Sequence, residues 1–225
     1  MTATEYNHLP KQLKNHYILA RHGFSLANND KLICSNPDIA IPEVGGPRNT
    51  GYGLHEIGIE QVEASAKTLA EHLGDNKKDQ VKVYCSPFLR TKMTAQIFSK
   101  GLGITAEPTP NMALRERFYG KLDMTSDENY KLCWIDDNAA PDHGENSQYG
   151  IESTSSVVDR TTQFIVEEIE AKLEGQTVLL VAHGDVVQCM MTAFRHIEAW
   201  RHRELKHVDT ANWRDMVQEQ QEQGL

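Results

Sequence analysis

The stretch TVLLVAHGD, residues 177–185, joins a continuous apolar run to a polar turn, and no other stretch predicts a strand as strongly. An apolar run of this length predicts a buried strand that is covered on both faces, as in parallel sheets. The strand ends at His183, and Val186 to about His196 is expected to follow as a helix. We therefore expect His183 at the carboxyl end of a central strand, where a strand-to-helix turn begins.

Two further strands are predicted to end in polar turns of the same kind. Tyr17–Ala20 is a short apolar run that leads into Arg21-His22-Gly23, and Val81–Cys85 alternates before Ser86-Pro87. A helix is predicted over Phe88–Leu102, with Ser86 suited to cap it and Pro87 suited to its first position. Carboxyl ends of parallel strands face one crevice, so the three turns are expected to meet there.

The alternation of strands and helices predicts the fold class. Helices are also expected over Ile57–Leu73 and Thr154–Glu174, and a short strand over Ile104–Pro108. Such alternation indicates an α/β fold, a three-layer sandwich with a largely parallel central sheet and helices on both faces. We expect residues 1–225 to form a single domain with lid-like inserted loops at about 31–53 and 121–153, because both stretches lack regular patterning.

Composition narrows the classes of partner and chemistry. The 225 residues carry a formal net charge of −9, which disfavours nucleic acid and anionic membranes as partners. No stretch approaches the ~20 apolar residues of a transmembrane helix, and the first residues do not resemble a signal peptide. The four cysteines form no Cys-x-x-Cys pair, which leaves zinc and dithiol chemistry without support. We therefore expect a cytoplasmic protein, and no sequence feature indicates its oligomeric state.

The predicted crevice gathers cationic and imidazole groups. Arg21 and His22 come from the first turn, Arg90 from the helix that follows the second turn, and His183 and Gly184 from the third. Arginine forks match phosphate oxygens, and the amide of Gly184 at a helix N-terminus adds a donor. These residues predict a phosphate-binding site whose fixed cations would also stabilise a phosphoryl-transfer transition state.

Two side chains are candidates for the chemical steps. A neutral imidazole is a competent nucleophile, and neighbouring cations disfavour its protonation, so His22 is the candidate that takes the phosphoryl group. The leaving oxygen needs a proton, and Glu116 is the candidate general acid. Other carboxylates that could reach the crevice are Glu56, Glu145 and Glu152.

Five ordered motifs resemble the histidine phosphatase superfamily, which includes the cofactor-dependent phosphoglycerate mutases. They are RHGFSLAN (21–28), LHEIGIEQ (54–61), SPFLRT (86–91) with Thr94-Ala95, ERFYG (116–120) and VAHG (181–184). The resemblance implies that His22 is phosphorylated and that Glu116 donates and accepts the proton. It implies a phosphate pocket made by Arg21, Arg90 and His183, with Asn28 beside it. It also implies that no metal and no other cofactor takes part.

The chain departs from the family pattern in several places. Phe24 follows the first glycine where the family often has Glu or Gln, and His55 stands where Thr is usual. An insertion of roughly Lys31 to Gly53 separates the first two motifs. The paired arginines with which mutases hold a second phosphate are missing between Gly120 and the last helix. These differences argue against a mutase and leave the substrate open.

We therefore expect a metal-independent phosphatase that hydrolyses a small phosphate monoester through a phosphohistidine on His22. Two alternatives remain open: a phosphoglycerate mutase-type phosphoryl transfer, and a non-catalytic module that binds a phosphorylated partner in the same pocket. Binding alone would not require both a nucleophile and an acid, which disfavours the module. We interpret Trp134 as a packing residue and His207 as a solvated or pairing histidine.

Overall fold

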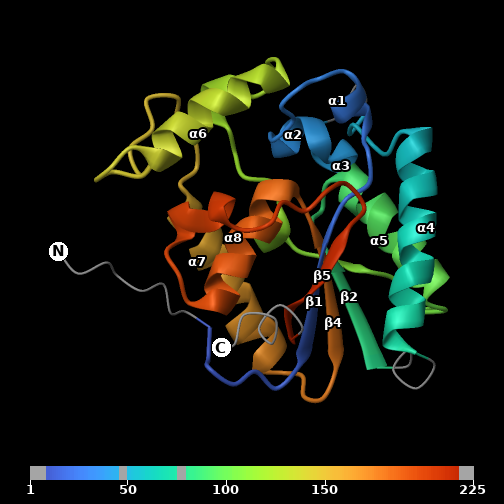
Figure 1. Cartoon of the computed structure of the whole chain (residues 1–225). Coiled ribbons are helices and arrows are strands. Elements are labelled where there is room, and N and C mark those ends of the chain that lie inside the picture. Colours follow the sequence, from blue (N-terminus) through green and yellow to red (C-terminus); the bar gives the residue numbers. More distant parts are fainter. Residues whose placement is uncertain (1–8, 46–49, 75–79, 218–225) are drawn as a thin grey trace.

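A five-stranded sheet forms the centre of the computed structural model, which describes residues 9–45, 50–74 and 80–217 (Figure 1). The strand order is β3-β2-β4-β1-β5, in which β1 to β4 run parallel and β5 lies antiparallel beside β1. The sheet is thus largely parallel, with its antiparallel strand at an edge. The strands are β1 (His16–Arg21), β2 (Val81–Cys85), β3 (Thr109–Pro110), β4 (Thr177–Ala182) and β5 (Trp213–Asp215).

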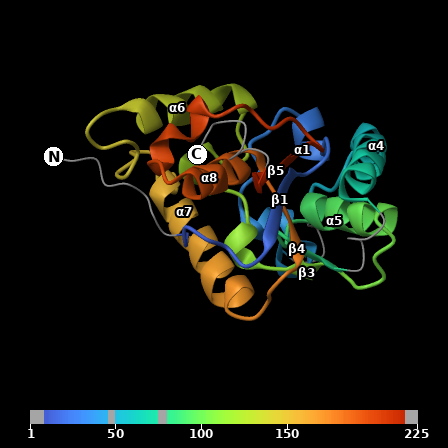
Figure 2. The ribbon, with the colours of Figure 1, turned by 60° about the horizontal axis from the view of Figure 1, so that its bottom comes forward.

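Helices cover both faces of this sheet (Figure 2). On one face lie α4 (Glu56–Leu73) and α5 (Leu89–Gly101), and on the other lie α7 (Thr154–Gln163) and α8 (Gly184–Arg195). This arrangement confirms the predicted three-layer α/β sandwich. None of the helices in the described ranges combines the length and the apolar character that a membrane crossing requires.

The side chains of β4 alternate between two hydrophobic cores. Val178 and Leu180 pack with α7 and α8, whereas Leu179 and Val181 pack with α4 and α5. All four are fully buried. Burial of one such side chain contributes about 1.5–3 kcal/mol of transfer free energy, so both faces of this strand favour apolar residues at every position. The continuous apolar run of 177–182 therefore reflects a strand enclosed between two helical layers.

The structure corrects three expected boundaries. α5 begins at Leu89, and its N-cap is Phe88 rather than Ser86; the Ser86 hydroxyl accepts from the amide of Phe88 at 3.3 Å and also lies 2.9 Å from Nε2 of His183. The strand expected over Ile104–Pro108 is displaced along the chain to the two-residue β3, Thr109–Pro110. The helix expected over 154–174 is α7 followed by a π-helical segment, Phe164–Glu170. β5 was not predicted, because its short Trp-Arg-Asp run has no strand-like pattern.

Both inserted segments lie over the end of the sheet at which the parallel strands finish (Figure 1). The first contains α2 (Pro37–Ala40) and α3 (Pro42–Gly45), and its residues 46–49 lie outside the described ranges. Ala40 and Ile41 of this segment pack on Phe88 at the start of α5. The second carries α6 (Tyr130–Asn138). Other short helices are α1 (Leu26–Asn29) and the 3₁₀ helices Met112–Leu114, Gly120–Leu122, Asp127–Asn129 and Ala199–Glu204.

Candidate functional site

Strand register brings the three polar turns together. β1 and β4 pair so that Arg21 lies opposite Ala182, which sets His22 beside His183 at the next position. The amide of His22 donates to the carbonyl of Ala182 at 3.0 Å, and the amide of Ser86 continues the ladder between β2 and β4. The carboxyl ends of three neighbouring strands thus present one histidine, one serine and a second histidine side by side.

His22 is buried, and its ring is held at both nitrogens. Nδ1 lies 2.7 Å from the carbonyl oxygen of Gly23, and Nε2 lies 3.2 Å from Nε of Arg90. A carbonyl oxygen accepts and a guanidinium N–H donates, so Nδ1 carries the proton and Nε2 presents its lone pair. Burial, together with the positive charges of Arg90 and Arg21, holds the pKa of His22 well below its usual range. The ring is therefore neutral at physiological pH.

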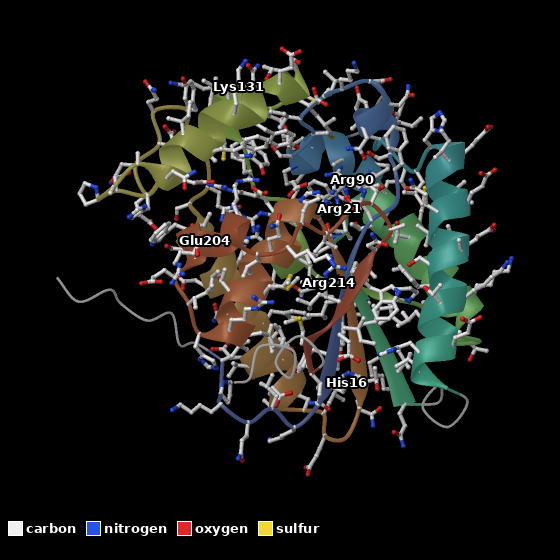
Figure 3. All side chains as sticks on the ribbon, viewed as in Figure 1. His16, Arg21, Arg90, Lys131, Glu204 and Arg214 are labelled. Carbon is white, nitrogen blue, oxygen red and sulfur yellow. The ribbon has the colours of Figure 1, made fainter. Side chains whose placement is uncertain are left out.

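Two arginines reach the cavity beside His22 from different elements (Figure 3). Arg90, in the first turn of α5, donates from Nη2 to the carbonyl of Cys34 at 2.9 Å. Arg21, at the end of β1, donates from Nη1 to the carbonyl of Val208 at 2.9 Å. Nη1 of Arg90 and Nε of Arg21 are buried and have no hydrogen-bond partner within the described part of the chain. Buried donors of this kind cost free energy unless a ligand accepts from them, which an anion would do.

His183 lies against His22 but not in the lining of the cavity. The two ring centroids are 5.2 Å apart. Nε2 of His183 lies 2.9 Å from the Ser86 hydroxyl, and Nδ1 lies 3.4 Å from Oε2 of Glu116. Burial, followed by the charge of Arg90, holds the pKa of His183 well below its usual range. The ring is thus a neutral group that is oriented by a serine and faces a carboxyl group.

Gly184 and Asn28 also line the cavity. A Cβ on Gly184 would lie 3.3 Å from the Arg21 guanidinium, so glycine allows this guanidinium to pack closely on the start of α8. The Asn28 amide oxygen accepts from the amide and hydroxyl of Ser25 at 3.0 Å and 2.8 Å. A ligand in the cavity would therefore meet the NH₂ donors of Asn28, which again suits an anion.

Glu116 is the buried carboxyl group of the cavity. Its Oε2 lies 3.5 Å from Nη2 of Arg90. Burial raises the pKa of Glu116 to about 7, against the lowering effect of Arg90, and the charge of Asp185 also raises it. A carboxyl group with a pKa near neutrality can both give and take a proton at physiological pH.

The other candidate carboxylates lie elsewhere. Glu152 is held by Arg115 at 2.8 Å and by Arg160 at 2.9 Å. The described residues that line the cavity do not include Glu152, Glu56 or Glu145. Glu116 therefore stands apart from the alternatives by its position.

The cavity has a volume of about 160 Å³, and six of the seven predicted site residues line it. The remaining lining residues, which we call the outer side of the cavity, were not predicted from the sequence. The predicted ones are Arg21, His22, Asn28, Arg90, Glu116 and Gly184, and the additional ones include Tyr119, Tyr130, Trp134, Asp185, Arg203 and His207.

Asp185 organises the outer side of the cavity. It accepts from the Tyr119 hydroxyl at 2.6 Å, from Nη2 of Arg203 at 2.8 Å and from Nη1 of Arg117 at 3.3 Å. Burial alone would raise the pKa of Asp185, but the charges of Arg203, His202 and Arg117 outweigh it and hold the pKa below its usual range. The one sequence signal for Asp185 is its place directly after the predicted His183-Gly184 turn.

Trp134 is not the packing residue that we expected. Its side chain is 43% exposed, it lines the cavity, and the guanidinium of Arg203 lies 4.7 Å from its ring centroid. His207 pairs as expected, with its Nε2 3.1 Å from Nη1 of Arg21, but its place in the cavity lining was not predicted. Sequence periodicity could not find either residue, since α6, which carries Trp134, is a short helix without a clear apolar face, and His207 lies in an irregular segment.

The two unusual residues of the first motifs contact each other. Phe24 and His55 form an edge-to-face ring pair with centroids 5.8 Å apart. His55 is the N-cap of α4, and its Nδ1 accepts from the amide of Ile57 at 3.3 Å. His55 thus takes the capping role for which Thr is suited, and its ring packs on Phe24.

A group of three buried side chains has the spacing of metal ligands. One ligand atom each from His22, Glu116 and His183 lies within 4.8 Å of the others, in the part of the chain that the structure describes. The guanidinium of Arg90 contacts both His22 and Glu116. A fixed positive charge at this position opposes the binding of a cation and favours an anion.

Comparison with known proteins agrees with these features. Residues 17–225 match the histidine phosphatase superfamily (branch 1). A 2,3-bisphosphoglycerate-dependent phosphoglycerate mutase of Xanthobacter autotrophicus is 30% identical over 183 residues, which cover 77% of this chain and 78% of that protein.

Two solved structures show the same fold. A mycobacterial glucosyl-3-phosphoglycerate phosphatase in complex with VO3 has a TM-score of 0.65 at 20% identity, covering 88% of this chain and 90% of that chain. A phosphoserine phosphatase of Entamoeba histolytica, in complex with 3-phosphoglyceric acid, has a TM-score of 0.66 at 17% identity, covering 88% of each chain. With the match across nearly its whole length, the chain belongs to the histidine phosphatase superfamily, and its relatives include both phosphatases and a mutase.

Proposed function

We propose that this protein is a metal-independent phosphatase that hydrolyses a small phosphate monoester through a phosphohistidine on His22. The observation that carries this proposal is the unprotonated Nε2 of His22 in a cavity lined by Arg21 and Arg90. A nucleophilic lone pair, cations with unused donors and a carboxyl group with a pKa of about 7 stand within one small cavity. Each of these features serves phosphoryl transfer.

In the first step, Nε2 of His22 attacks phosphorus. A P–N bond forms, and the P–O ester bond breaks with its electron pair on the leaving oxygen. The proton of Glu116 passes to that oxygen, while Arg21, Arg90 and the NH₂ of Asn28 bind the phosphoryl oxygens. The carbonyl of Gly23 stabilises the positive charge that develops on the ring, because it accepts the Nδ1 proton.

In the second step, the Glu116 carboxylate takes a proton from water, and the water oxygen attacks phosphorus. The P–N bond breaks, its electron pair returns to Nε2, and inorganic phosphate leaves. Glu116 is protonated again, and the site returns to its starting state. His183 lies behind the cavity lining, and we propose that its neutral ring, which contacts Glu116 and Ser86, supports the phosphate pocket from there.

A mutase is the second candidate, and the 30% identity to a phosphoglycerate mutase favours it. A mutase passes the phosphoryl group to a second hydroxyl instead of water. A pure binding module is disfavoured, because a buried acid next to a neutral histidine adds nothing to the binding of phosphate. The phosphatases and the mutase among the relatives carry names of small phosphorylated compounds, which supports a substrate of that class.

The test is phosphate release from an aryl phosphate in the presence of EDTA. Aryl phosphates have good leaving groups and so need little help from Glu116. We compare the native protein with His22→Ala and with His16→Ala, a control at the opposite end of β1 (Figure 3). Release that survives EDTA, is lost in His22→Ala and persists in His16→Ala supports the proposal.

Loss of release on chelation, or equal release by native protein and His22→Ala, would contradict it. A mutase is recognised in the same reactions when an added alcohol or hydroxy acid is offered. Transfer of labelled phosphoryl groups to the added hydroxyl in place of water identifies that alternative.

A further inference from the structure

The outer side of the cavity contains a guanidinium that the proposed chemistry does not use. Arg203 belongs to the 3₁₀ helix Ala199–Glu204, which follows α8 (Figure 3 labels its neighbour, Glu204). It lines the same cavity as His22 and Arg90. Arg203 follows α8 in the chain, whereas the paired arginines of mutases are expected before α8, after Gly120.

Arg203 is held in place from two sides. Nη2 donates to both carboxylate oxygens of Asp185, at 2.8 Å and 3.1 Å. The Trp134 ring lies under the guanidinium, with 4.7 Å between the guanidinium carbon and the ring centroid. Tyr119 fixes Asp185 in turn through its hydroxyl, at 2.6 Å. A guanidinium that is fixed before binding loses little conformational entropy when a ligand arrives.

Part of this guanidinium remains without a protein acceptor. Both contacts with Asp185 use Nη2, and Nε is buried without a hydrogen-bond partner within the described part of the chain. The nearby Arg117 differs, because Nη1 and Nη2 both bond Asp137, at 2.8 Å and 2.6 Å. Of these two cations, Arg203 is the one that lines the cavity and has a buried donor to offer.

Arg203 lies within the same cavity as the proposed acid. Glu116, Asp185 and Arg203 all belong to its lining, and Asp185 contacts Arg203 at 2.8 Å. A group attached to the oxygen that Glu116 protonates therefore shares this cavity with Arg203.

We propose that Arg203 is a specificity-determining residue that binds a carboxylate on the leaving group, so that the substrate is a phosphate monoester of a small hydroxy acid. This inference rests on the proposed function. One cation with unused donors matches one anionic group of single charge, and charge-assisted hydrogen bonds to a carboxylate are strong. A second phosphate would bring two negative charges against this one cation, beside the carboxylate of Asp185.

The test compares two substrates that differ in one charge: phosphoglycolate, which carries a carboxylate, and its amide, phosphoglycolamide. The measured quantity is the ratio of kcat/KM for the acid to kcat/KM for the amide. A charge-assisted hydrogen bond is worth about 1.5–3 kcal/mol, so we expect native protein to favour the acid at least about tenfold. Arg203→Gln should bring the ratio close to one.

Arg201→Gln is the matched control. Arg201 lies on the same 3₁₀ helix, pairs with Glu204 at 2.8 Å and does not line the cavity. This variant should keep the native ratio. Arg203→Lys keeps a charge near Asp185 but moves it within the cavity, and we expect its ratio to fall at least threefold. If Arg203→Gln does not fold, the inference is tested by comparing the acid-to-amide ratio of kcat/KM between native protein and Arg203→Lys.

A native ratio near one overturns the inference, and so does a native ratio that is retained in Arg203→Gln or in a folded Arg203→Lys. A purely structural role would lower the turnover of both substrates equally and leave the ratio unchanged. Aryl phosphate hydrolysis separates this result from failure of the proposed function. If native protein releases no phosphate from any substrate, the proposed function fails, and calorimetric Kd values for the same acid and amide give the ratio instead.

Discussion

Nε of Arg90 lies 3.2 Å from Nε2 of His22, and this contact determines the chemical state of the histidine. The guanidinium has only hydrogens to offer, so Nε2 must be unprotonated. Gly23 receives the proton of Nδ1 on the other side of the ring. The same arginine also has a buried Nη1 without a partner among the described residues. Arg90 thus prepares the nucleophile and keeps a donor for the group that the nucleophile attacks.

The first prediction concerns the covalent intermediate. Native protein mixed with a ³²P-labelled aryl phosphate and quenched within milliseconds should carry label that is stable in alkali and released in acid, as expected for a P–N bond. His22→Asn should carry none, whereas the His16→Ala control should be labelled normally. Label that is stable in acid, or label retained in His22→Asn, would place the phosphoryl group on another residue.

The second prediction concerns Arg90. Arg90→Ala should lower kcat for an aryl phosphate by about 10²–10³-fold, the range seen when one fixed donor to a transition-state oxyanion is removed. Arg90→Lys should remain well below native activity, because an ammonium cannot reach His22, Cys34 and the phosphate together. The control is Lys92→Met on the same helix, where Lys92 pairs with Glu43 at the surface. An equal loss of activity in Arg90→Ala and in the Lys92→Met control would indicate damage to α5 and not a role for Arg90.

The third prediction is a pH dependence that differs between leaving groups. Glu116, with a pKa of about 7, acts as an acid only while it is protonated. For an alkyl phosphate, kcat/KM, which reports the pKa values of the free enzyme, should therefore fall as pH rises through about 7, whereas kcat/KM for an aryl phosphate should respond far less. His22 stays neutral over this range because its pKa is lowered.

Glu116→Gln checks this assignment. Gln cannot supply a proton, so the variant should lose most alkyl phosphate turnover and retain a larger share of aryl phosphate turnover. The alkaline fall should disappear from its pH profile. An unchanged alkaline limb in Glu116→Gln would assign that limb to another group.

Most of the inner side of the cavity was predictable from the fold, because Arg21, His22, Arg90 and Gly184 lie at strand ends or helix starts. Asn28 and Glu116 came from the motifs that resemble the histidine phosphatase superfamily. Val178–Ala182 predicts a strand by apolarity alone, and parallel strands align their carboxyl ends. This geometry brings His22 to His183 without knowledge of any contact. Arg90 follows from the same rule, since it stands in the first turn of the helix after β2.

The outer side was not predictable for an equally physical reason. Trp134 and Arg203 meet through packing between α6 and a 3₁₀ helix that are far apart in sequence, and no periodicity encodes that meeting. The predicted cap of α5 was wrong because the helix begins later, at Leu89. The Ser86 hydroxyl accepts from the amide of Phe88 and also contacts the His183 ring, and the local sequence does not encode this second, tertiary contact.

The fourth prediction concerns stability and tests the cost of the buried acid. The pKa of Glu116 is raised from 4.5 in the unfolded chain to about 7 in the folded protein. The folded state therefore holds a proton that the unfolded state has lost, and stability falls as pH rises from about 4.5 to about 7. Glu116→Gln has no such loss.

The melting temperature of Glu116→Gln relative to native protein should consequently increase between pH 5 and pH 8. A shift of this kind is worth on the order of 2–3 kcal/mol, or about 5–10 °C for a chain of this size. Glu60→Gln, at an exposed position of α4, should show no such trend. A difference between the Glu116→Gln and native melting temperatures that is constant with pH would mean that Glu116 is ionised in the folded protein.

The last prediction concerns Gly58, a glycine that does not line the cavity. Gly58 lies in the first turn of α4, and a Cβ there would be 2.0 Å from the carbonyl oxygen of Phe24. Phe24 is two residues after His22, so Gly58→Ala must displace the backbone that follows the nucleophile. Overpacking of this kind costs about 1–3 kcal/mol, which corresponds to a melting temperature lowered by about 2–12 °C. Glu60→Ala, half a turn further on and exposed, should change stability by less than about 0.5 kcal/mol.

Gly58→Ala should also lower kcat at temperatures well below the melting temperature of the variant. The reason is that the displaced segment includes Gly23, whose carbonyl accepts the Nδ1 proton of His22. A folded Gly58→Ala protein with native kcat would show that the turn after His22 yields to the added methyl group without moving the imidazole.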